Sequence, residues 1–390
     1  MAEVERQVES LDPRRPDEFY ADLTALSSTV GRLRRTAEVA RDATGKHAEP
    51  PAARAAASAT PAAGLDEWTF AESVEPHRRE LQVHCYRMVG SYDDSEDLVQ
   101  ETFLRAWRNR EGFEGRSSFR TWLYKIATNT CIDFLRRTNR APQQYQPVAG
   151  MEHGSDQPPA RIAWLQPYPD ELLDEVASDE ATPDAAVVSR ETMELVFLAA
   201  IQHLPVRQRA VLIMRDVLGW PAADTAELLD MSVASVNSAL QRARPTLREH
   251  LPERRTDWAT PEATQQEREV LERYMTAAQR TDLDAMAEML SEDVRLTMPP
   301  NPFWFVGRDA FLNFVMPSLE PGSPMFFGQW RHVLTRANRM PAVAGYVQRP
   351  GTEVYRAQVL DVLRIEDGRI AEITSFEPHL FAAFGLPLTL

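Results

Sequence analysis

The sequence has few cysteines, few lysines and no long apolar run. Its two cysteines, Cys85 and Cys131, are too few for a disulfide framework and favour a reducing compartment. No stretch of about 18 apolar residues occurs and no basic-then-apolar leader opens the chain, so the sequence predicts neither a membrane span nor a secretion signal. These absences predict a cytoplasmic protein that has no membrane partner.

The sequence also lacks an excess of positive charge, since 58 acids outnumber 43 basic residues. The formal net charge of -15 argues against a protein that coats DNA indiscriminately, because phosphate affinity comes mainly from Lys and Arg. Any nucleic-acid contact must therefore come from local basic patches. His77, His84 and Cys85 lie close together, but no fourth ligand has the spacing of a zinc site. We therefore predict no metal and no cofactor.

The stretch from residue 94 to residue 137 changes the sign of its charge along its length. Asp97 and Glu101 are among the acids at the start of a helical pattern, where carboxylates suit the positive helix end. From Arg105 to Arg140, nine basic residues oppose three acids. An acidic face followed by a basic, aromatic one suits two partners, a basic protein surface and a nucleic acid.

Three motifs in this stretch, Asp97-Leu98-Val99-Gln100-Glu101, Phe119-Arg120-Thr121-Trp122-Leu123 and Ala127-Thr128-Asn129, closely resemble region 2 of bacterial extracytoplasmic-function (ECF) sigma factors. In that family the acidic helix binds the clamp helices of the polymerase beta-prime subunit, and the following loop and helix open and read the minus-10 promoter element. The resemblance implies polymerase contacts at Asp97, Leu98, Val99 and Gln100. It implies promoter DNA contacts at Arg116, Ser117, Ser118, Arg120, Asn129, Asp133 and Arg136.

Trp122 has two interpretations. It is either a core aromatic of a helical bundle or a side chain that stacks on an unpaired base. We include it among the predicted DNA-binding residues.

The chain divides into six predicted segments, of which the first lies outside this resemblance. In residues 1–65, apolar residues between positions 17 and 43 recur at alternating steps of four and three, which predicts a helix with one packing seam. This helix could pack against the sigma domains of its own chain, against a second copy of the chain or against a regulatory protein. An Ala/Pro-rich tether ends this extension. Residues 66–140 form the second segment, sigma region 2, as a bundle of about four helices.

Residues 141–185 are predicted to form an acidic, proline-rich linker. Nine acids oppose Arg161 alone, a composition typical of a solvated tether. In the family, this segment threads through the polymerase cleft towards the RNA exit channel, where acids stand in for RNA phosphates. The aromatic run Trp164–Pro169 either anchors that thread or forms a local turn cluster.

Residues 186–252 have strong helical periodicity and contain a helix-turn-helix pattern. Pro221 opens the first helix, Asp230-Met231 turns the chain, and Ser232 caps the second helix. The exposed side of that second helix has small polar residues and then arginines, with no acid until Glu249, as a major-groove reader requires. The predicted DNA contacts are Ala234, Ser235, Asn237, Ser238, Gln241, Arg242 and Arg244.

Three further motifs, Leu204-Pro205, Gln208-Arg209-Ala210-Val211 and Gln241-Arg242-Ala243-Arg244, resemble sigma region 4. In the family this region reads the minus-35 element and binds the polymerase beta flap. Regions 2 and 4 in this order imply a sigma factor that binds core RNA polymerase and directs promoter-specific transcription initiation.

A hinge at 253–265 precedes a third domain at 266–390. Two helical patterns are followed by strand-like runs at 294–298, 329–335, 342–348, 355–365 and 369–376, with a hairpin turn at Glu366–Arg369. This order resembles the SnoaL-like division of the NTF2-like fold. The predicted fold class is therefore multidomain: two all-α sigma domains, a helical bundle and a helix-turn-helix domain, plus an α+β NTF2-like cone with a curved antiparallel sheet.

Catalysis in the predicted cone would require an acid or base on an inward-facing strand position. His332, Asp361 and Glu377 have no recognisable partner in the sequence, so we expect surface or helix-capping roles and predict no catalytic residue and no enzyme. The resemblance implies control of the sigma domains in cis, with a small-molecule ligand of the cone left open. The alternatives are a transcription-linked enzyme whose pocket turns over a small hydrophobic molecule, and a repressor that uses only its helix-turn-helix.

Overall fold

The computed structural model describes residues 67–138 apart from 114 and 116, 151–155, 164–174, 193, 195–251, and 265–390 apart from 281, 300 and 302. The predicted N-terminal helix, the tether, most of the acidic linker and nearly all of the hinge lie outside these residues. The described residues from 67 to 321 and from 327 to 390 belong to one structural unit. Among the described residues, no helix combines the length and the apolar character needed to cross a bilayer.

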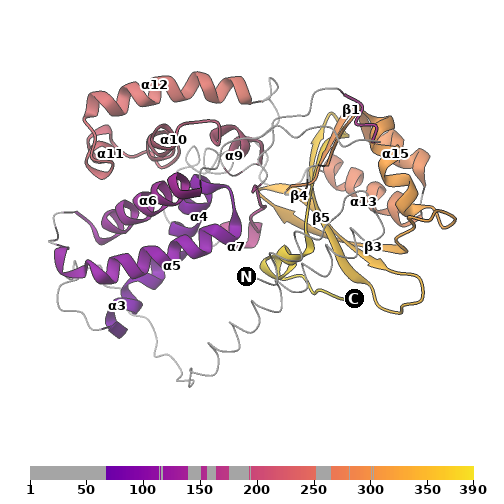
Figure 1. Cartoon of the computed structure of the whole chain (residues 1–390), viewed down its shortest axis with the longest axis horizontal. Helices are drawn as coiled ribbons and strands as arrows, with labels where there is room; N and C mark the ends of the chain where they lie inside the picture. Colours follow the sequence, from indigo (N-terminus) through magenta and orange to yellow (C-terminus); the bar gives the residue numbers. More distant parts are fainter. Residues whose placement is uncertain are drawn as a thin grey trace. The chain divides into compact units, whose positions relative to one another are not determined.

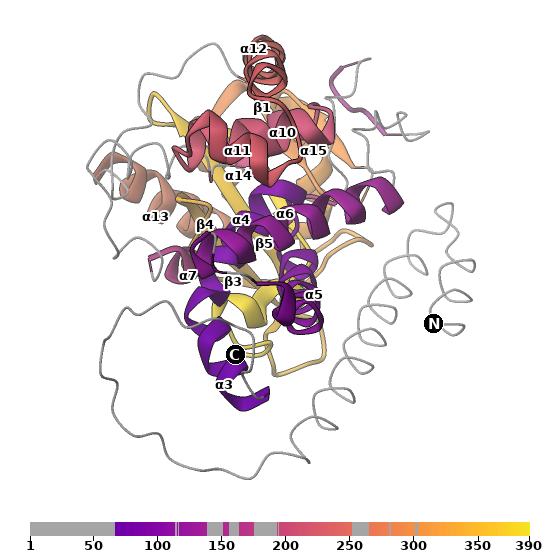
Figure 2. The same cartoon turned by 90° about the vertical axis from the view of Figure 1, so that its left-hand side faces the viewer.

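The first domain is helical, as predicted. Helices α4, α5 and α6 pack against one another (Figure 2). Apolar side chains at helical spacing form its core, including Leu81 and Met88 of α4 and Leu123 of α6. The elements are α3 (Glu67–Val74), the 3-10 helix η1 (Glu75–His77), α4 (Arg78–Val89), α5 (Tyr92–Arg108), the 3-10 helix η2 (Arg110–Gly112) and α6 (Phe119–Thr138).

The corner between α4 and α5 is set by two small residues. Gly90 ends α4 with φ of 74°, a left-handed conformation that glycine adopts without strain. The Ser91 side chain then accepts a hydrogen bond from the backbone N–H of Asp94, at 3.3 Å, which caps α5. The connection between the two helices is therefore short, because α5 already begins at Tyr92.

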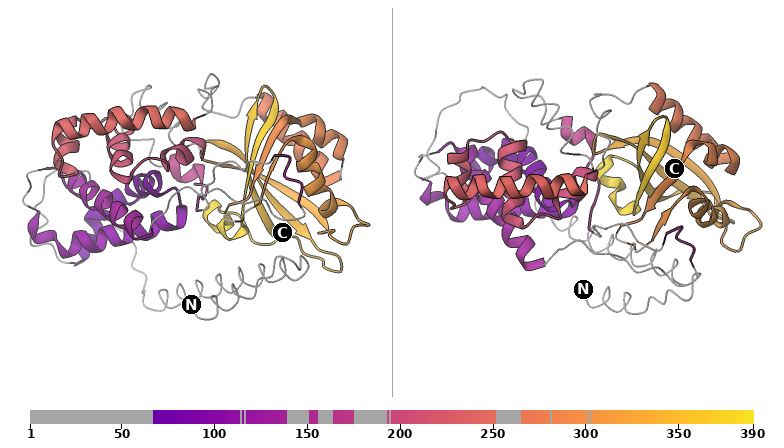
Figure 3. Two further views of the ribbon diagram at one scale, coloured as in Figure 1. Left: turned by 45° about the horizontal axis from the view of Figure 1, so that its top comes forward. Right: turned by 90° about the horizontal axis from the view of Figure 1, so that it is seen from above.

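The second domain is also helical. Figure 3 shows α11 leading into the long helix α12. The elements are α9 (Leu195–Ile201), α10 (Val206–Leu212), the π-helix η3 (Ile213–Val217), α11 (Ala222–Leu228) and α12 (Val233–His250).

The predicted helix-turn-helix is confirmed, and its turn and helix starts lie at the expected residues. Pro221 precedes α11, and Asp230 turns the chain with φ of 49°. Ser232 accepts a hydrogen bond from the backbone N–H of Ser235, at 3.1 Å, and so caps α12. An apolar residue at the start of this helix would be expected to face the core, but Val233 is 44% exposed. It is the first residue of α12 and lies before the buried stripe that starts at Val236.

The third domain combines helices with one sheet. Figure 1 shows α13 and α15 on the same side of this sheet. The sequence did not predict β2 or α15, because a three-residue strand is too short to show alternation and α15 contains a proline. The elements are α13 (Gln265–Arg280), α14 (Leu283–Met289), β1 (Leu290–Thr297), β2 (Trp304–Val306), α15 (Arg308–Leu319), β3 (Gln329–Ala337), β4 (Met340–Gln348), β5 (Arg356–Glu366), β6 (Arg369–Phe376) and the 3-10 helix η4 (Pro378–Phe384).

The sheet has six strands in the order β2-β1-β6-β5-β4-β3 and is mixed rather than wholly antiparallel. Strands β1 and β6 pair in parallel, whereas the other neighbours are antiparallel. The prediction of an antiparallel sheet is therefore wrong for the β1–β6 pair. Hairpin connections make sequential strands antiparallel, but β1 and β6 are separated by four other strands and a helix, so no hairpin sets their direction. The predicted turn before Arg369 is confirmed, with positive φ at Asp367 and Gly368.

Strand register places several polar residues on one face of the sheet. Asp361 lies opposite both Ser375 and Val343, and His332 lies opposite Gly345. Because directly opposed residues and alternate residues share a face, His332, Asp361 and Ser375 lie on the same side. The opposite face contributes Ala344, Leu360 and Val362 to a buried cluster that continues into the helical domains.

Candidate polymerase and promoter interfaces

The predicted polymerase-binding residues divide into two pairs. Asp97 and Gln100 are exposed on α5. Leu98 and Val99 are 4% and 1% exposed and belong to the core. The helical period places the first pair outward and the second inward, so only Asp97 and Gln100 present side chains to a partner. The direct polymerase contact expected for Leu98 and Val99 stays a prediction, and their burial favours a packing role that holds α5 in place.

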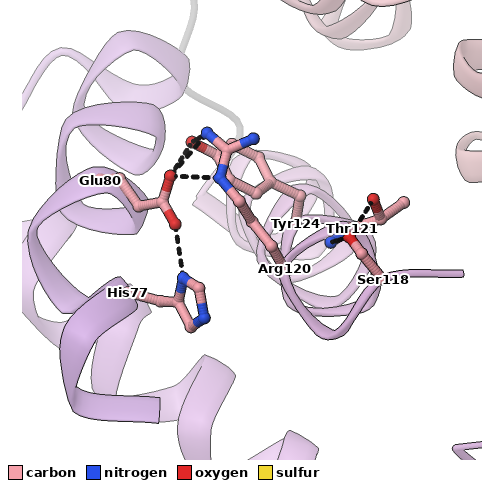
Figure 4. Close-up of polar contacts among 6 residues, drawn as sticks. All are labelled: His77, Glu80, Ser118, Arg120, Thr121 and Tyr124. Atoms are coloured by element: carbon pink, nitrogen blue, oxygen red, sulfur yellow. Dashed lines mark hydrogen bonds and ion pairs between the residues drawn. The ribbon is translucent and has the colours of Figure 1, made fainter. Parts of the chain in front are cut away.

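The start of α6 carries two of the predicted DNA contacts, shown in Figure 4. Ser118 accepts a hydrogen bond from the backbone N–H of Thr121, at 3.0 Å, and so caps the helix. Arg120 donates from Nε to the Glu80 carboxylate on α4, at 2.6 Å, and its guanidinium lies over the Tyr124 ring. The His77 ring is 2.6 Å from the other oxygen of Glu80.

The Glu80 carboxylate is the centre of this network. Burial by itself raises its pKa, but the hydrogen bonds from His77 and Arg120 outweigh burial and lower the pKa below its usual value. Arg120 is thus paired with a carboxylate within the domain, although its side chain stays 49% exposed. The sequence did not identify Glu80 as the residue that holds Arg120, because 40 residues separate the two.

The remaining predicted contacts of this domain differ in their surroundings. Trp122 is partly buried, with its ring centroid 5.1 Å from Phe113 and 5.6 Å from Phe119, which favours the core interpretation. Asp133 accepts a hydrogen bond from Arg105, at 2.9 Å. Ser117 and Arg136 are exposed, Asn129 is half-buried, and Arg116 lies outside the described residues.

The exposed face of α12 has the composition that the sequence predicts. Ala234, Ser235, Asn237, Ser238, Gln241, Arg242 and Arg244 are all exposed. Arg244 donates two hydrogen bonds to Asp216 of η3, at 2.8 and 3.0 Å, so this arginine is held by an acid that the sequence did not suggest. Arg242 directly follows Gln241 in α12 and is the other arginine of this exposed face.

The two helical domains contact each other through α6 and α10. Arg209 of α10 is buried and donates to the carbonyl of Met88, at 2.7 Å, which lowers the energetic cost of burying its charge. The Tyr124 ring of α6 lies 5.4 Å from the Trp220 ring, which precedes α11. Lys125 is 3.8 Å from the carboxylate of Asp230 in the helix-turn-helix. The first of the two predicted DNA-binding helices therefore lies against the second domain.

The acid–base residues of the third domain are less exposed than the sequence led us to expect. Asp361 is 9% exposed and accepts a hydrogen bond from Ser375, at 2.5 Å. Burial raises the pKa of Asp361 to about 6 and lowers that of His332 to about 4. Tyr274 of α13 interacts electrostatically with Asp361. The surface role predicted for Asp361 is thus wrong, because its strand position is buried beside α13, whereas His332 is half-buried.

Glu377 has a structural role instead. It lies between β6 and η4, where one oxygen is 3.6 Å from His379 and the other accepts a weak hydrogen bond from Asn301, at 3.5 Å. Among the described residues, no group of three or more His, Cys, Asp or Glu is arranged to hold a metal ion. His77 and His84, which are close in sequence, bond instead to Glu80 and Thr128.

A helical domain with a basic helix, a helix-turn-helix domain and a SnoaL-type cone together define a DNA-binding transcription protein. Comparison with family models agrees with each part. Residues 74–141 match Sigma-70 region 2, residues 194–247 match Sigma-70 region 4, and residues 271–373 match the SnoaL-like domain.

Similar proteins and solved structures show which family of transcription proteins this is. The chain is 40% identical over 328 residues to the ECF RNA polymerase sigma factor SigG of Mycobacterium tuberculosis, which covers 82% of this chain and 85% of that protein. It is 30% identical over 188 residues to SigW of Bacillus subtilis, covering 48% of this chain and 90% of SigW. The crystal structure of Mycobacterium tuberculosis SigJ matches with a TM-score of 0.51 and 23% identity, over 82% of this chain and 99% of that one.

The likeness to SigJ shows the fold, and the likeness to SigG shows the family. The chain belongs to the ECF RNA polymerase sigma factors, with a SnoaL-like domain at its C-terminal side. As a member of that family it acts in promoter-specific transcription. The predicted family and fold class are therefore confirmed, with the mixed sheet as the one correction.

Proposed function

We propose that this sigma factor binds core RNA polymerase through the exposed acids of α5, opens and reads the minus-10 element with the start of α6, and reads the minus-35 element with α12. The observation that carries this proposal is the exposed face of α12, where seven neighbouring side chains are small, amide-bearing or basic. The beta-prime clamp helices and the beta flap are the polymerase surfaces that the family resemblance suggests. Since core polymerase and promoters are its partners, we infer that it works in the cytoplasm.

Reading both promoter elements requires the two helical domains to separate. Elements named minus-10 and minus-35 are about 25 base pairs apart, or about 85 Å along B-DNA at 3.4 Å per base pair. In this structure Tyr124 of α6 lies 5.4 Å from Trp220, one residue before the proline that precedes α11. The structure therefore corresponds to a closed state, and we propose that the SnoaL-like domain regulates in cis the passage to an open one.

Run-off transcription with purified core polymerase tests the main proposal. Full-length protein should produce a transcript from a fixed start site on a promoter template, and none from a template with a scrambled minus-35 element. Core polymerase alone is the matched control. Transcripts that start at random, or no transcript at any sigma concentration, would reject the proposal.

A small-molecule ligand or substrate of the third domain is the second candidate. The observation behind it is the sheet face that holds the buried Asp361 and Ser375 together with the half-buried His332, with Tyr274 of α13 near Asp361. The sigma factor relatives argue for a non-catalytic protein, so we infer that this domain is regulatory rather than an enzyme. Turnover of a polyketide-like or steroid-like molecule that is lost separately in Asp361→Asn and His332→Gln would reverse that inference.

A further inference from the structure

The turn between β3 and β4 is buried, which is unusual for a hairpin tip. Asn338 and Arg339 both have positive φ, 56° and 63°, yet Asn338 is 0% exposed. Hairpin turns normally face water, since their polar backbone groups need partners. A buried tip therefore indicates that other parts of the chain supply those partners.

The Asn338 side chain bonds to three separate parts of the chain. Its Nδ2 donates to the Tyr86 hydroxyl on α4, at 2.8 Å, and to the carbonyl of Met193 just before sigma region 4, at 2.6 Å. Its Oδ1 accepts from the backbone N–H of Tyr168 in the linker, at 2.8 Å. One amide of the SnoaL-like domain thus joins region 2, the linker and the approach to region 4.

The linker pairs with this turn along a short stretch. The Asn338 N–H donates to the carbonyl of Tyr168, at 2.9 Å, and Pro169 forms an antiparallel bridge with Ala337. Asp170 then accepts from the Arg339 N–H, at 2.7 Å, and from Arg336, at 3.1 Å. Burial raises the pKa of Asp170, while the bonds from Arg339 and Arg336 oppose that rise.

The same linker segment is also fastened to region 2. Gln166 accepts from the Asp93 N–H, at 2.9 Å, and from the Ser91 hydroxyl, at 3.0 Å. The Tyr168 ring lies 4.8 Å from Tyr86 and 5.4 Å from Tyr92. The short helix α7 (Asp170–Asp174) continues from this point, and Asp174 pairs with Arg339.

By contrast, the surfaces proposed to meet polymerase and the minus-35 element are open. Asp97 and Gln100 remain exposed on α5, and the DNA-reading face of α12 is exposed along its length. The SnoaL-like domain therefore restrains the linker rather than covering these side chains.

We propose that Asn338 is the latch through which the SnoaL-like domain holds linker residues 164–174 against region 2. The latched protein binds core polymerase through α5, and release of Asn338 is the separate, later step that frees the linker and lets regions 2 and 4 part. This inference rests on the proposed function, since it specifies how the cis regulation works. In this scheme the regulated step is the release of Asn338, and it follows the binding of core polymerase.

The test uses the full chain with Asn338→Gly and Asn338→Asp. Glycine keeps the left-handed turn and removes the side-chain bonds, whereas aspartate places an oxygen against the Met193 carbonyl in place of a donor. The matched control is Asp367→Gly, a left-handed position in the β5–β6 turn of the same sheet. Far-ultraviolet circular dichroism reports whether each variant keeps its fold.

Three measurements test whether Asn338 holds the linker: hydrogen exchange, transcription and polymerase affinity. Amide hydrogen exchange of residues 164–174 should be faster by about tenfold or more in both Asn338 variants, since glycine loses all three side-chain hydrogen bonds and aspartate loses the two that Nδ2 donates. Promoter-directed run-off transcription should rise, and affinity for core polymerase should stay within about twofold of wild type, as expected for a site away from the interface. Asp367→Gly should change none of these.

Each contrary result has a distinct meaning. Unchanged exchange of 164–174, or faster exchange with no gain in transcript, would overturn the latch while wild-type transcription still upholds the proposed function. A large change in polymerase affinity would overturn the claim that docking precedes release. Absence of any promoter-directed transcript in wild type and variants alike would reject the proposed function itself.

Discussion

The Nε2 atom of His379 lies 3.5 Å from the carboxylate of Asp93, and this contact joins the SnoaL-like domain to the first turn of α5. Asp93 also accepts a hydrogen bond from Gln166 of the linker, at 3.0 Å. The helix that carries the proposed polymerase-binding acids is thus held at its N-terminal end by the linker and by the C-terminal domain.

The His379 contact should make stability depend on pH. Burial opposes the charged ring, but hydrogen bonds to Asp93 and Glu377 outweigh it and raise the pKa of His379 to about 9. Because the folded pKa exceeds the ordinary 6.5, this contribution is complete below pH 6.5 and is lost as the pH rises through about 9. Urea denaturation should show wild type losing about 1–2 kcal/mol more than His379→Gln over that range. Parallel pH profiles for the two proteins would contradict the assignment.

Reversing charge at Asp97 should weaken polymerase binding. Asp97→Arg places a positive charge on the exposed face of α5, so affinity for core polymerase should fall by at least about tenfold through like-charge repulsion. Surface plasmon resonance with immobilised core enzyme measures this. Glu320→Arg, an exposed acid after α15, is the control and should bind as wild type does. Equal affinity of the two variants would remove α5 from the proposed interface.

Loss of Arg242 should affect DNA binding and spare polymerase binding. We expect Arg242→Ala to reduce promoter binding by the reconstituted holoenzyme and, if the contact is to phosphate, to lower the slope of log K against log salt by about one. Arg349→Ala, an exposed arginine of the third domain, should leave the slope unchanged. Titration of labelled promoter duplex at several salt concentrations distinguishes the outcomes. No difference between the two variants would argue against a DNA contact at Arg242.

The Glu80–Arg120 pair should stabilise region 2. Glu80→Gln removes the charge from a carboxylate that is only 17% exposed and should lower the free energy of unfolding by about 1–3 kcal/mol. Since the pKa of Glu80 is lowered in the fold, this contribution is present above 4.5 and is lost as the pH falls through the folded pKa. Glu75→Gln, in the exposed pair with Arg78, should cost less than about 0.5 kcal/mol. Equal losses in the two variants would show that the Glu80 network adds no stability of its own.

Asp361 should be a source of instability at neutral pH. Burial raises its pKa from 3.8 to about 6, so above pH 6 the native state must hold a buried charge. Asp361→Asn should therefore stabilise the protein by about 1–3 kcal/mol well above pH 6 and by much less below pH 3.8. Val343→Ala, directly opposite on β4, is the packing control and should destabilise at both pH values. A destabilised Asp361→Asn would indicate that the charge has a partner in solution.

Local sequence determined much of the architecture. Ser91 sets the start of α5, Ser232 sets the start of α12, and the Asp367-Gly368 pair sets the β5–β6 turn. Each acts through bonds or dihedral angles within three residues of itself. Helical and alternating patterns predicted the two sigma domains and most strands of the cone, because a face that must be buried repeats with the period of its element. The exposed face of α12 followed from the same periodicity.

Other features depended on residues far apart in the chain, and only the tertiary structure decided them. The parallel pairing of β1 with β6, the bond of Arg120 to Glu80 and the burial of Asp361 under α13 join positions that no local period relates. Asn338 is the clearest example, because its hydrogen-bond partners lie 145 to 252 residues away. A polar residue in a turn is ordinarily solvated, and its role as an interdomain contact arises only once the folded chain brings those partners to it.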